Sequence, residues 1–290
     1  MTAVHSREAA ALPPTGPSPH PGMPVSATVR AFGALVARDL TVLRRQPLDF
    51  FARSVVQPLM LLFALGYVMP HIAAGASGTS AGSTFAADQA TTLLAGMLAM
   101  VVLFQGITAV AMPLVQEFGV TREIDDRVLS PVPVSLVACA KVAVGALQGL
   151  LAAAMVFPLA EFVPAERPAL HIDWPVLLTL APLGALLFSS LGLYLGSAFQ
   201  ARNVMALFAT LLTPVLYLGC TLYPWSALDN VRWVQLVSLI NPLTFLSEGF
   251  RASVTSADHL SLLVVYPVLI AATALLLGRG IRHFRGRVVS

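Results

Sequence analysis

The chain has 290 residues, of which 57% are hydrophobic and only 11% are charged, and its formal net charge at pH 7 is +3. Because an ordinary soluble domain carries about 25% charged residues, this composition excludes such a domain and indicates an integral membrane protein. The basic residues stand in short segments between apolar runs, as membrane topology requires, so the positive charge does not indicate nucleic-acid binding.

The amino-terminal part divides into a proline-rich segment, residues 1–28, and a basic amphipathic segment, residues 29–48. The first holds six prolines and few apolar residues, which predicts a disordered cytoplasmic tail. In the second, the arginines lie mostly away from one apolar helical face, which is formed by Phe32, Leu35, Val36, Leu40 and Leu43. We therefore expect residues 29–48 to form an interfacial helix in the cytoplasmic headgroup layer.

Six uncharged stretches follow, and each approaches the ~20 residues that a helix needs to cross ~30 Å of hydrocarbon. They lie roughly at residues 54–74, 91–115, 142–160, 176–200, 204–223 and 260–278. The expected fold class is therefore an all-α integral membrane protein with six transmembrane helices.

The distribution of lysine and arginine predicts the direction of these spans. With the amino end inside, 14 of the 17 basic residues lie on the inner side, and only Arg167, Arg232 and Arg251 lie outside. Inner loops of membrane proteins are enriched in lysine and arginine, so we expect both termini in the cytoplasm. The chain would then be a multi-pass protein of the plasma membrane, which in bacteria is the inner membrane.

A short polar segment, residues 116–133, separates the second span from the third. It packs four acids and two arginines together, and its candidate partner-binding residues are Glu117, Arg122, Glu123, Asp125, Asp126 and Arg127. Apolar residues recur among them at near-helical spacing, and Pro131 and Pro133 stop a helix before the next span. We interpret the segment as a cytoplasmic surface to which a second protein binds. The alternative is a solvated loop that only enforces topology.

Small residues in the third and fourth spans favour close helix packing. Gly145 and Gly149 stand four apart in the third span, and Gly192 and Gly196 do so in the fourth. Such spacing lets helix backbones approach each other. We favour packing within one subunit over a dimer seam for both pairs.

The last outer segment, residues 224–256, predicts an external pair of short helices rather than a simple loop. Asn241 fits a helix N-cap, and Pro242 fits the first helical position. Each helix has one apolar face, formed by Trp233, Leu236, Val237 and Ile240 in the first and by Leu243, Leu246 and Phe250 in the second. Both are too short to span, so we expect them at the outer interface or dipping into it. Glu248 and Arg251 are three apart, which predicts an exposed ion pair worth a few tenths of a kcal/mol.

The sequence lacks the motifs of several common nucleotide-binding and metal-binding sites. A P-loop ends in Gly-Lys-Ser/Thr, whereas the only lysine, Lys141, stands between alanine and valine. The six histidines are scattered without the spacing of a zinc hydrolase. Cys139 and Cys220 also lack metal-site spacing, and we expect them to be small buried apolar residues. We therefore predict no catalytic or metal site and no cofactor bound by this chain.

An intramembrane prenyltransferase-like enzyme is one alternative, because such enzymes hold magnesium and diphosphate with aspartates in cytoplasmic loops. Asp125 and Asp126 lie in a loop of that kind. The chemistry requires two sets of carboxylates that converge on the metal ions, and only one adjacent pair is present.

The spans, the interfacial helix, the charged segment and the sequence Asn241-Pro-Leu-Thr-Phe-Leu-Ser-Glu-Gly-Phe-Arg251 together resemble the membrane subunits of ABC-2 type transporters. This is a family of drug, polysaccharide and lipo-oligosaccharide exporters. The resemblance covers about residues 29–287, which would form one ABC-2 type transmembrane domain. Residues 116–133 resemble the family's coupling region, where an acidic and basic segment leads to a Pro-Val-Pro turn and a lysine. The chain differs at Asp125-Asp126, where many relatives carry glycine or threonine.

The resemblance implies the permease subunit of an ATP-driven exporter that moves an amphipathic drug, lipid or glycolipid out of the cytoplasm. ATP and magnesium would bind to a separate P-loop ATPase subunit, present in two copies. A second permease subunit, identical or different, would complete the path, with membrane lipids around it. From the residues alone, a non-transporting membrane scaffold is a further alternative.

Overall fold

The computed structural model describes the helices of the chain and several of their connections. The described residues are 25–45, 56, 60, 63–68, 71–72, 81–118, 133–162, 171–199, 201–255 and 258–289. Every regular element in these ranges is a helix, which confirms the all-α prediction. The expected tail lies outside the described residues except for its last four. The first expected span is described only in short pieces, such as the π-helix η1 (Phe63–Val68).

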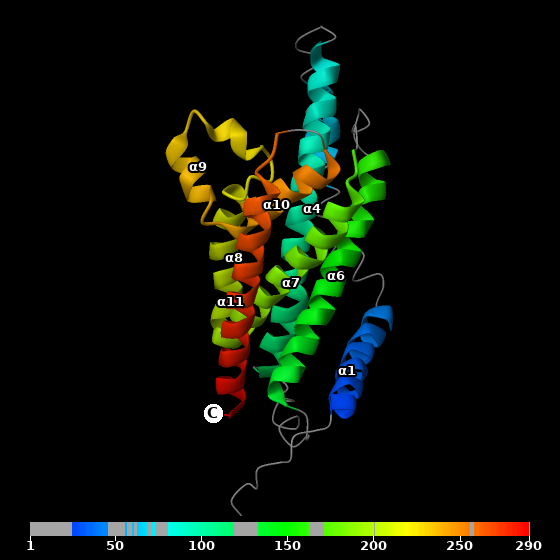
Figure 1. Ribbon diagram of the computed structural model, residues 1–290, viewed down its shortest axis with the longest axis vertical. Coiled ribbons are helices and arrows are strands. Elements are labelled where there is room, and N and C mark those ends of the chain that lie inside the picture. The colour runs from blue at the N-terminus through cyan, green and yellow to red at the C-terminus, as the bar shows by residue number, and fades with distance from the viewer. Residues whose placement is uncertain are drawn as a thin grey trace, which may run out of the picture.

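The expected interfacial helix is α1 (Val25–Arg45), which packs against α6 (Val134–Phe162). Figure 1 shows α1 beside the part of α6 nearest to its start. Phe32 and Leu35 are half-buried, whereas Arg30 and Arg44 are exposed. At least part of the apolar side of α1 therefore lies against protein, and its place in the headgroup layer stays a prediction.

Four helices are long and apolar enough to cross a membrane, and they confirm four of the six expected spans. They are α4 (Ala81–Gln116), α6, α7 (Trp174–Ala198) and α11 (Leu262–Val289). The fifth expected span holds α8 (Ala201–Tyr217), which has 17 residues and ends before the expected stretch does. A tight turn follows it, in which Cys220 has a left-handed φ of 50°, a conformation through which a right-handed helix does not continue.

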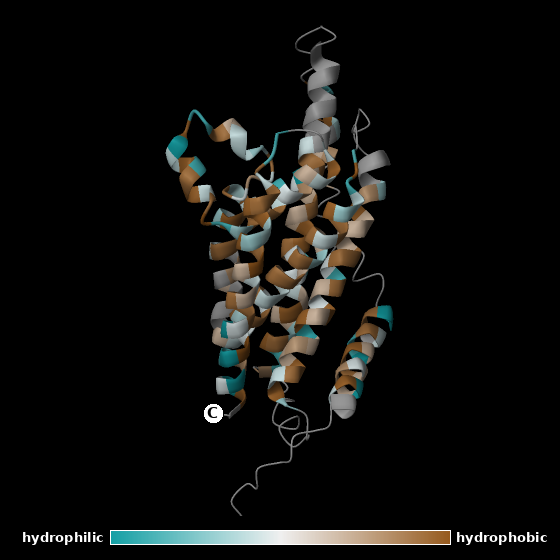
Figure 2. Ribbon diagram, in the orientation of Figure 1, coloured by the Kyte–Doolittle hydropathy of each residue, from teal (hydrophilic) through white to brown (hydrophobic). Residues whose placement is uncertain are grey.

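The long helices α4, α6, α7 and α11 run side by side along the long axis in Figure 1. The end of α4, the start of α6 and the carboxyl terminus lie together at one end of the molecule, which we call the C-terminal end. The opposite end, which we call the α9 end, holds three short helices: η3 (Trp225–Leu228), α9 (Arg232–Ser238) and α10 (Pro242–Val254). Figure 2 shows apolar residues along the spans and polar residues on α1 and at the carboxyl end of α11.

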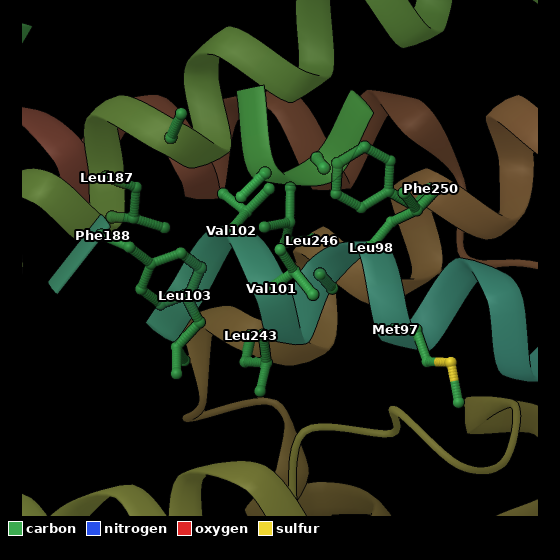
Figure 3. Packing of buried hydrophobic residues seen from close by; sticks show 14 of the residues in the cluster. Met97, Leu98, Val101, Val102, Leu103, Leu187, Phe188, Leu243, Leu246 and Phe250 are labelled. Carbon is green, nitrogen blue, oxygen red and sulfur yellow. The ribbon is translucent and has the colours of Figure 1, made fainter. Parts of the chain in front are cut away.

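The hydrophobic core lies where α4, α7 and α10 meet. Figure 3 shows Leu98 and Val102 of α4 beside Phe188 of α7 and Leu246 of α10. These four side chains are inaccessible to solvent. Because α10 also contacts α11, it is inserted among the spans rather than laid across them.

The predicted small-residue pairs pack within the subunit, as expected. A Cβ atom on Gly192 of α7 would lie 2.6 Å from the carbonyl oxygen of Ile107 on α4, and one on Gly196 would also crowd α4. A Cβ atom on Gly145 of α6 would crowd side chains of α4 and α7, and the nearest atoms to Gly149 also belong to these two helices. The absence of side chains at these positions lets α4, α6 and α7 approach closely.

Candidate functional site

The polar segment at residues 116–133 begins at the C-terminal end, and the structure describes its first three residues and its last. Arg122, Glu123, Asp125, Asp126 and Arg127 lie outside the described residues, so their role in binding a partner stays a prediction. The prenyltransferase-like alternative depends on two of these aspartates and is likewise untested. Among the described residues, no three His, Cys, Asp or Glu side chains come together as metal ligands would.

Glu117, directly after α4, forms an ion pair with Lys141 of α6. The Nζ atom of Lys141 donates a hydrogen bond to Oε1 of Glu117 at 2.7 Å. The side chains of Lys141 and Glu117 are only 8% and 13% exposed, so each charge has lost most of its water. Desolvation of such ions costs several kcal/mol each, and the opposite charge offsets that cost. The pair therefore fixes the start of the polar segment to α6.

Phe118 ties the same segment to α11. The Cζ atom of Arg287 lies 4.5 Å from the centroid of the Phe118 ring, in a cation–π arrangement. The ring of Phe284 meets Phe118 edge-on, with centroids 5.8 Å apart. Two neighbouring residues of the polar segment, Glu117 and Phe118, thus contact α6 and α11.

Arg287 extends this contact to α7. Its Nη1 atom donates to the carbonyl oxygens of Phe199 at 2.6 Å and Ser197 at 3.2 Å, at the carboxyl end of α7. The last carbonyls of a helix have no partner within the helix and carry its negative dipole end, so a guanidinium suits both requirements. The sequence shows four arginines near the chain end but does not indicate which of them reaches α7.

The structure has the predicted helix break at Asn241 and Pro242, while the external placement of the helix pair stays a prediction. The Asn241 side chain accepts a hydrogen bond from the backbone N–H of Leu243 at 3.0 Å and caps α10, with Pro242 in its first turn. The Nδ2 atom of Asn241 also donates to the carbonyl oxygen of Val215 on α8 at 2.6 Å. One side chain therefore starts α10 and attaches it to α8.

The prediction of an exposed ion pair between Glu248 and Arg251 is wrong. The side chain of Arg251 is 0% exposed, and that of Glu248 is 1% exposed. Nη1 of Arg251 donates to Oε1 of Glu248. The helix spacing predicts the pair, but its burial results from α10 inserting among the spans and from two distant connections that cover it. Burial lowers the pKa of Arg251, and the Glu248 carboxylate opposes that shift.

The carboxylate of Glu248 accepts two further hydrogen bonds from backbone amides. Oε1 accepts from the N–H of Trp225, at the start of η3, at 2.8 Å. Oε2 accepts from the N–H of Leu260, two residues before α11, at 3.1 Å. Each carboxylate oxygen therefore holds a different segment of the α9 end.

The guanidinium of Arg251 makes the complementary contacts to backbone carbonyls. Its Nη2 atom donates to the carbonyl oxygens of Cys220 at 3.2 Å and Tyr223 at 3.4 Å, in the turn after α8. Cys220 is fully buried, as expected, whereas Cys139 is only partly buried. Together with Glu248, Arg251 thus connects α10 to three other segments.

The helix α9 and the two residues after it expose several apolar side chains and bury two polar ones. Trp233, Leu236 and Ile240 are 69%, 66% and 83% exposed, while Gln235 and Ser238 are buried. An exposed apolar face of this kind marks contact with lipid or with another protein. The expected place of α9 at the membrane boundary agrees with this face but stays a prediction.

Comparison with known proteins bears directly on the resemblance. The family model of the ABC-2 type transporter matches residues 30–255. The inner membrane transport permease YadH of Escherichia coli strain K12 is 31% identical over 151 residues, which make up 51% of this chain and 57% of that protein. The YadH proteins of Escherichia coli O157:H7 and of Shigella flexneri match to the same extent. The match thus spans little more than half the length of these relatives. Because the family model covers most of the chain, from α1 to the end of α10, the protein belongs to the ABC-2 type transporter family of membrane proteins.

Proposed function

We propose that this chain is the permease subunit of an ATP-driven exporter in the bacterial inner membrane, with ATP and magnesium bound by a separate P-loop ATPase present in two copies. The observation that carries the proposal is the family match over residues 30–255, which contains the polar segment and the spans α4, α6 and α7. The sequence supports a separate motor, because its 290 residues hold a single lysine outside any phosphate loop. The names of the relatives support the inner membrane as the location.

The contacts at the C-terminal end support entry of the force through residues 116–133. A pull on this segment would act directly on α4 and α6 through the Glu117–Lys141 pair. It would act on α7 and α11 through Phe118 and Arg287. Motion of a docked ATPase would then move four helices rather than a loose loop.

The cargo that we propose is an amphipathic drug, lipid or glycolipid, moved between this subunit and a second permease subunit, identical or different. The support is the apolar outer surface of the spans. Only 11% of the most apolar window of α11 is buried within this chain, compared with 78% for α4. The part of α11 that this chain leaves uncovered is available to lipid, to a second subunit and to apolar parts of a cargo.

The orientation that we propose places both termini in the cytoplasm and η3 outside the cell, as the arginine distribution predicts. A cysteine introduced by Ala227→Cys, in the exposed part of η3, should react with an impermeant thiol reagent on intact cells. One introduced by Ser290→Cys should react only after permeabilisation, and the unaltered chain gives the background. Labelling of Ser290→Cys alone on intact cells would reverse the orientation.

Charge reversal in the polar segment tests the docking of the ATPase. We expect Glu123→Arg and Arg127→Glu to leave the permease folded and inserted. They should reduce recovery of the ATPase in a pull-down at least tenfold and abolish substrate-stimulated ATP turnover, because complementary charges set the register of a docked partner.

The matched control for these reversals is Arg232→Glu, an exposed charge reversal on α9, which should dock and turn over ATP normally. If both variants, Glu123→Arg and Arg127→Glu, dock the ATPase and transport normally, residues 116–133 have no part in the mechanism. The segment would then be a solvated loop that only enforces topology, and the ATPase would have to dock elsewhere on the chain.

A further inference from the structure

The buried Glu248–Arg251 pair is the point at which four segments of the α9 end meet. The carboxylate holds the first residue of η3 and the residue two positions before α11, through their backbone amides. The guanidinium holds two carbonyls of the turn after α8. Both charged residues belong to α10. Two side chains therefore join the outer ends of α8, η3, α10 and α11.

Stability alone does not account for a charged pair at this place. A buried ion pair is often no more stabilising than apolar residues of similar volume, because both ions lose their water, whereas loss of one partner strands the other charge. The pair here is almost fully inaccessible, and the Nε atom of Arg251 has no hydrogen-bond partner among the described residues. In some proteins a buried pair of this kind favours one arrangement of its partners over others, and that is the role considered for this pair.

The other contacts of α10 hold it in the bundle without joining the same four segments. Leu246 packs against Gly184 of α7, and Leu180 of α7 packs against Gly249. The hydroxyl of Ser247 donates to the carbonyl of Gly219 at 2.8 Å and reaches only the turn after α8. Among the described polar contacts of α10, those of the Glu248–Arg251 pair are the ones that also reach η3 and the residues just before α11.

We propose that Glu248 and Arg251 are positioning residues of the transport cycle, which make the turn after α8, η3, α10 and the start of α11 move as one unit. The inference rests on the proposed export function. Its physical basis is the position of α11, which is held at the C-terminal end by Arg287 and at the α9 end by the Glu248 carboxylate. A displacement of α11 would thereby reach η3 and α8 through the pair.

Removal of both charges separates this role from a purely structural one. The double variant Glu248→Leu/Arg251→Met leaves no stranded charge, so we expect folded yield within twofold of the unaltered chain. ATP-driven transport by the reconstituted complex should nevertheless fall at least tenfold. The control Arg232→Met, the same change at an exposed position of α9, should transport normally. A double variant that folds and transports at the normal rate would show a purely structural pair and overturn the proposal.

A conservative variant decides the case in which the double variant does not fold. Arg251→Lys keeps the positive charge opposite Glu248 but lacks the planar fork that reaches the carboxylate and both carbonyls. We expect it to fold and to transport at least fivefold more slowly. Normal transport by Arg251→Lys would also overturn the proposal.

Hydrogen exchange reports the joint motion independently of transport. In the unaltered complex, nucleotide binding should change exchange in residues 220–223 and 258–260 together. In Arg251→Lys these two segments should respond separately, because Arg251 holds the carbonyls of Cys220 and Tyr223 whereas Glu248 holds Leu260. Independent responses in the unaltered complex would contradict the positioning role even if export is correct. A complex that transports nothing but shows the joint response would instead refute the export function and leave the link between the segments in place.

Discussion

Replacement of Lys141 by methionine should lower the free energy of unfolding by about 3–5 kcal/mol, as is typical when one partner of a buried ion pair is removed. The Glu117 carboxylate would remain in a site where only 13% of its side chain is exposed, without the ammonium that now lies 2.7 Å from it. Methionine has a similar length and leaves no large cavity, so the loss would come from removal of the positive charge beside the Glu117 carboxylate. Denaturant unfolding of the purified chain in mild detergent measures the effect.

Two further variants identify the cause of that loss. The double variant Glu117→Leu/Lys141→Met removes both charges and should recover all but about 1 kcal/mol of the stability, since apolar pairs often replace buried ion pairs at little cost. Arg285→Met, an exposed change at the same end, should stay within about 0.5 kcal/mol of the unaltered chain. If Lys141→Met is as mild as Arg285→Met, the ion pair contributes nothing to the fold.

Alanine in place of Gly96 should destabilise the protein by about 3 kcal/mol, at the upper end of the usual cost of overpacking. Gly96 lies on α4 directly against the backbone of Thr221 in the turn after α8, and an added Cβ atom would overlap the Thr221 carbonyl. Because the obstacle is main chain rather than a side chain, no change of rotamer can relieve it. The turn or α4 would have to shift.

The matched control for this change is Gly278→Ala on α11, where an added Cβ atom meets nothing within 4 Å. Alanine is the better helix former, so this variant should be more stable by about 0.5–1 kcal/mol. Thermal unfolding of both variants in the same detergent gives the comparison. Equal stability of the two would mean that α4 and the turn do not approach as closely as the structure has them.

The parts of the fold that were predictable depend on local sequence. A run of about 20 apolar residues without charge is sufficient to predict a span, and α4, α6, α7 and α11 follow from such runs. The start of α10 follows from Asn241-Pro242, because a cap and a proline act within one turn of helix. These features need no knowledge of which helices are neighbours.

The contacts that determine burial were not predictable, because their partners are distant in sequence. Arg251 contacts carbonyls 28 and 31 residues earlier, and Lys141 meets Glu117 24 residues away. Arg287 reaches α7 across 88 residues. Hydropathy shows that these residues are charged, but it does not show that a turn or a helix end covers them. The predicted exposure of the Glu248–Arg251 pair is wrong for this reason.

The unequal burial of the spans has a consequence for how the sequence can change over evolution. About four fifths of the apolar window of α4 is enclosed by the rest of the chain, whereas α11 has about one tenth enclosed. A new side chain on α4 must fit protein neighbours of fixed shape, since close-packed interiors respond to a single methylene. On most of α11 within this chain, leucine, isoleucine and valine can replace one another at little cost to the fold. Drift along α11 can therefore reshape the outer surface of the molecule while α4 preserves its architecture.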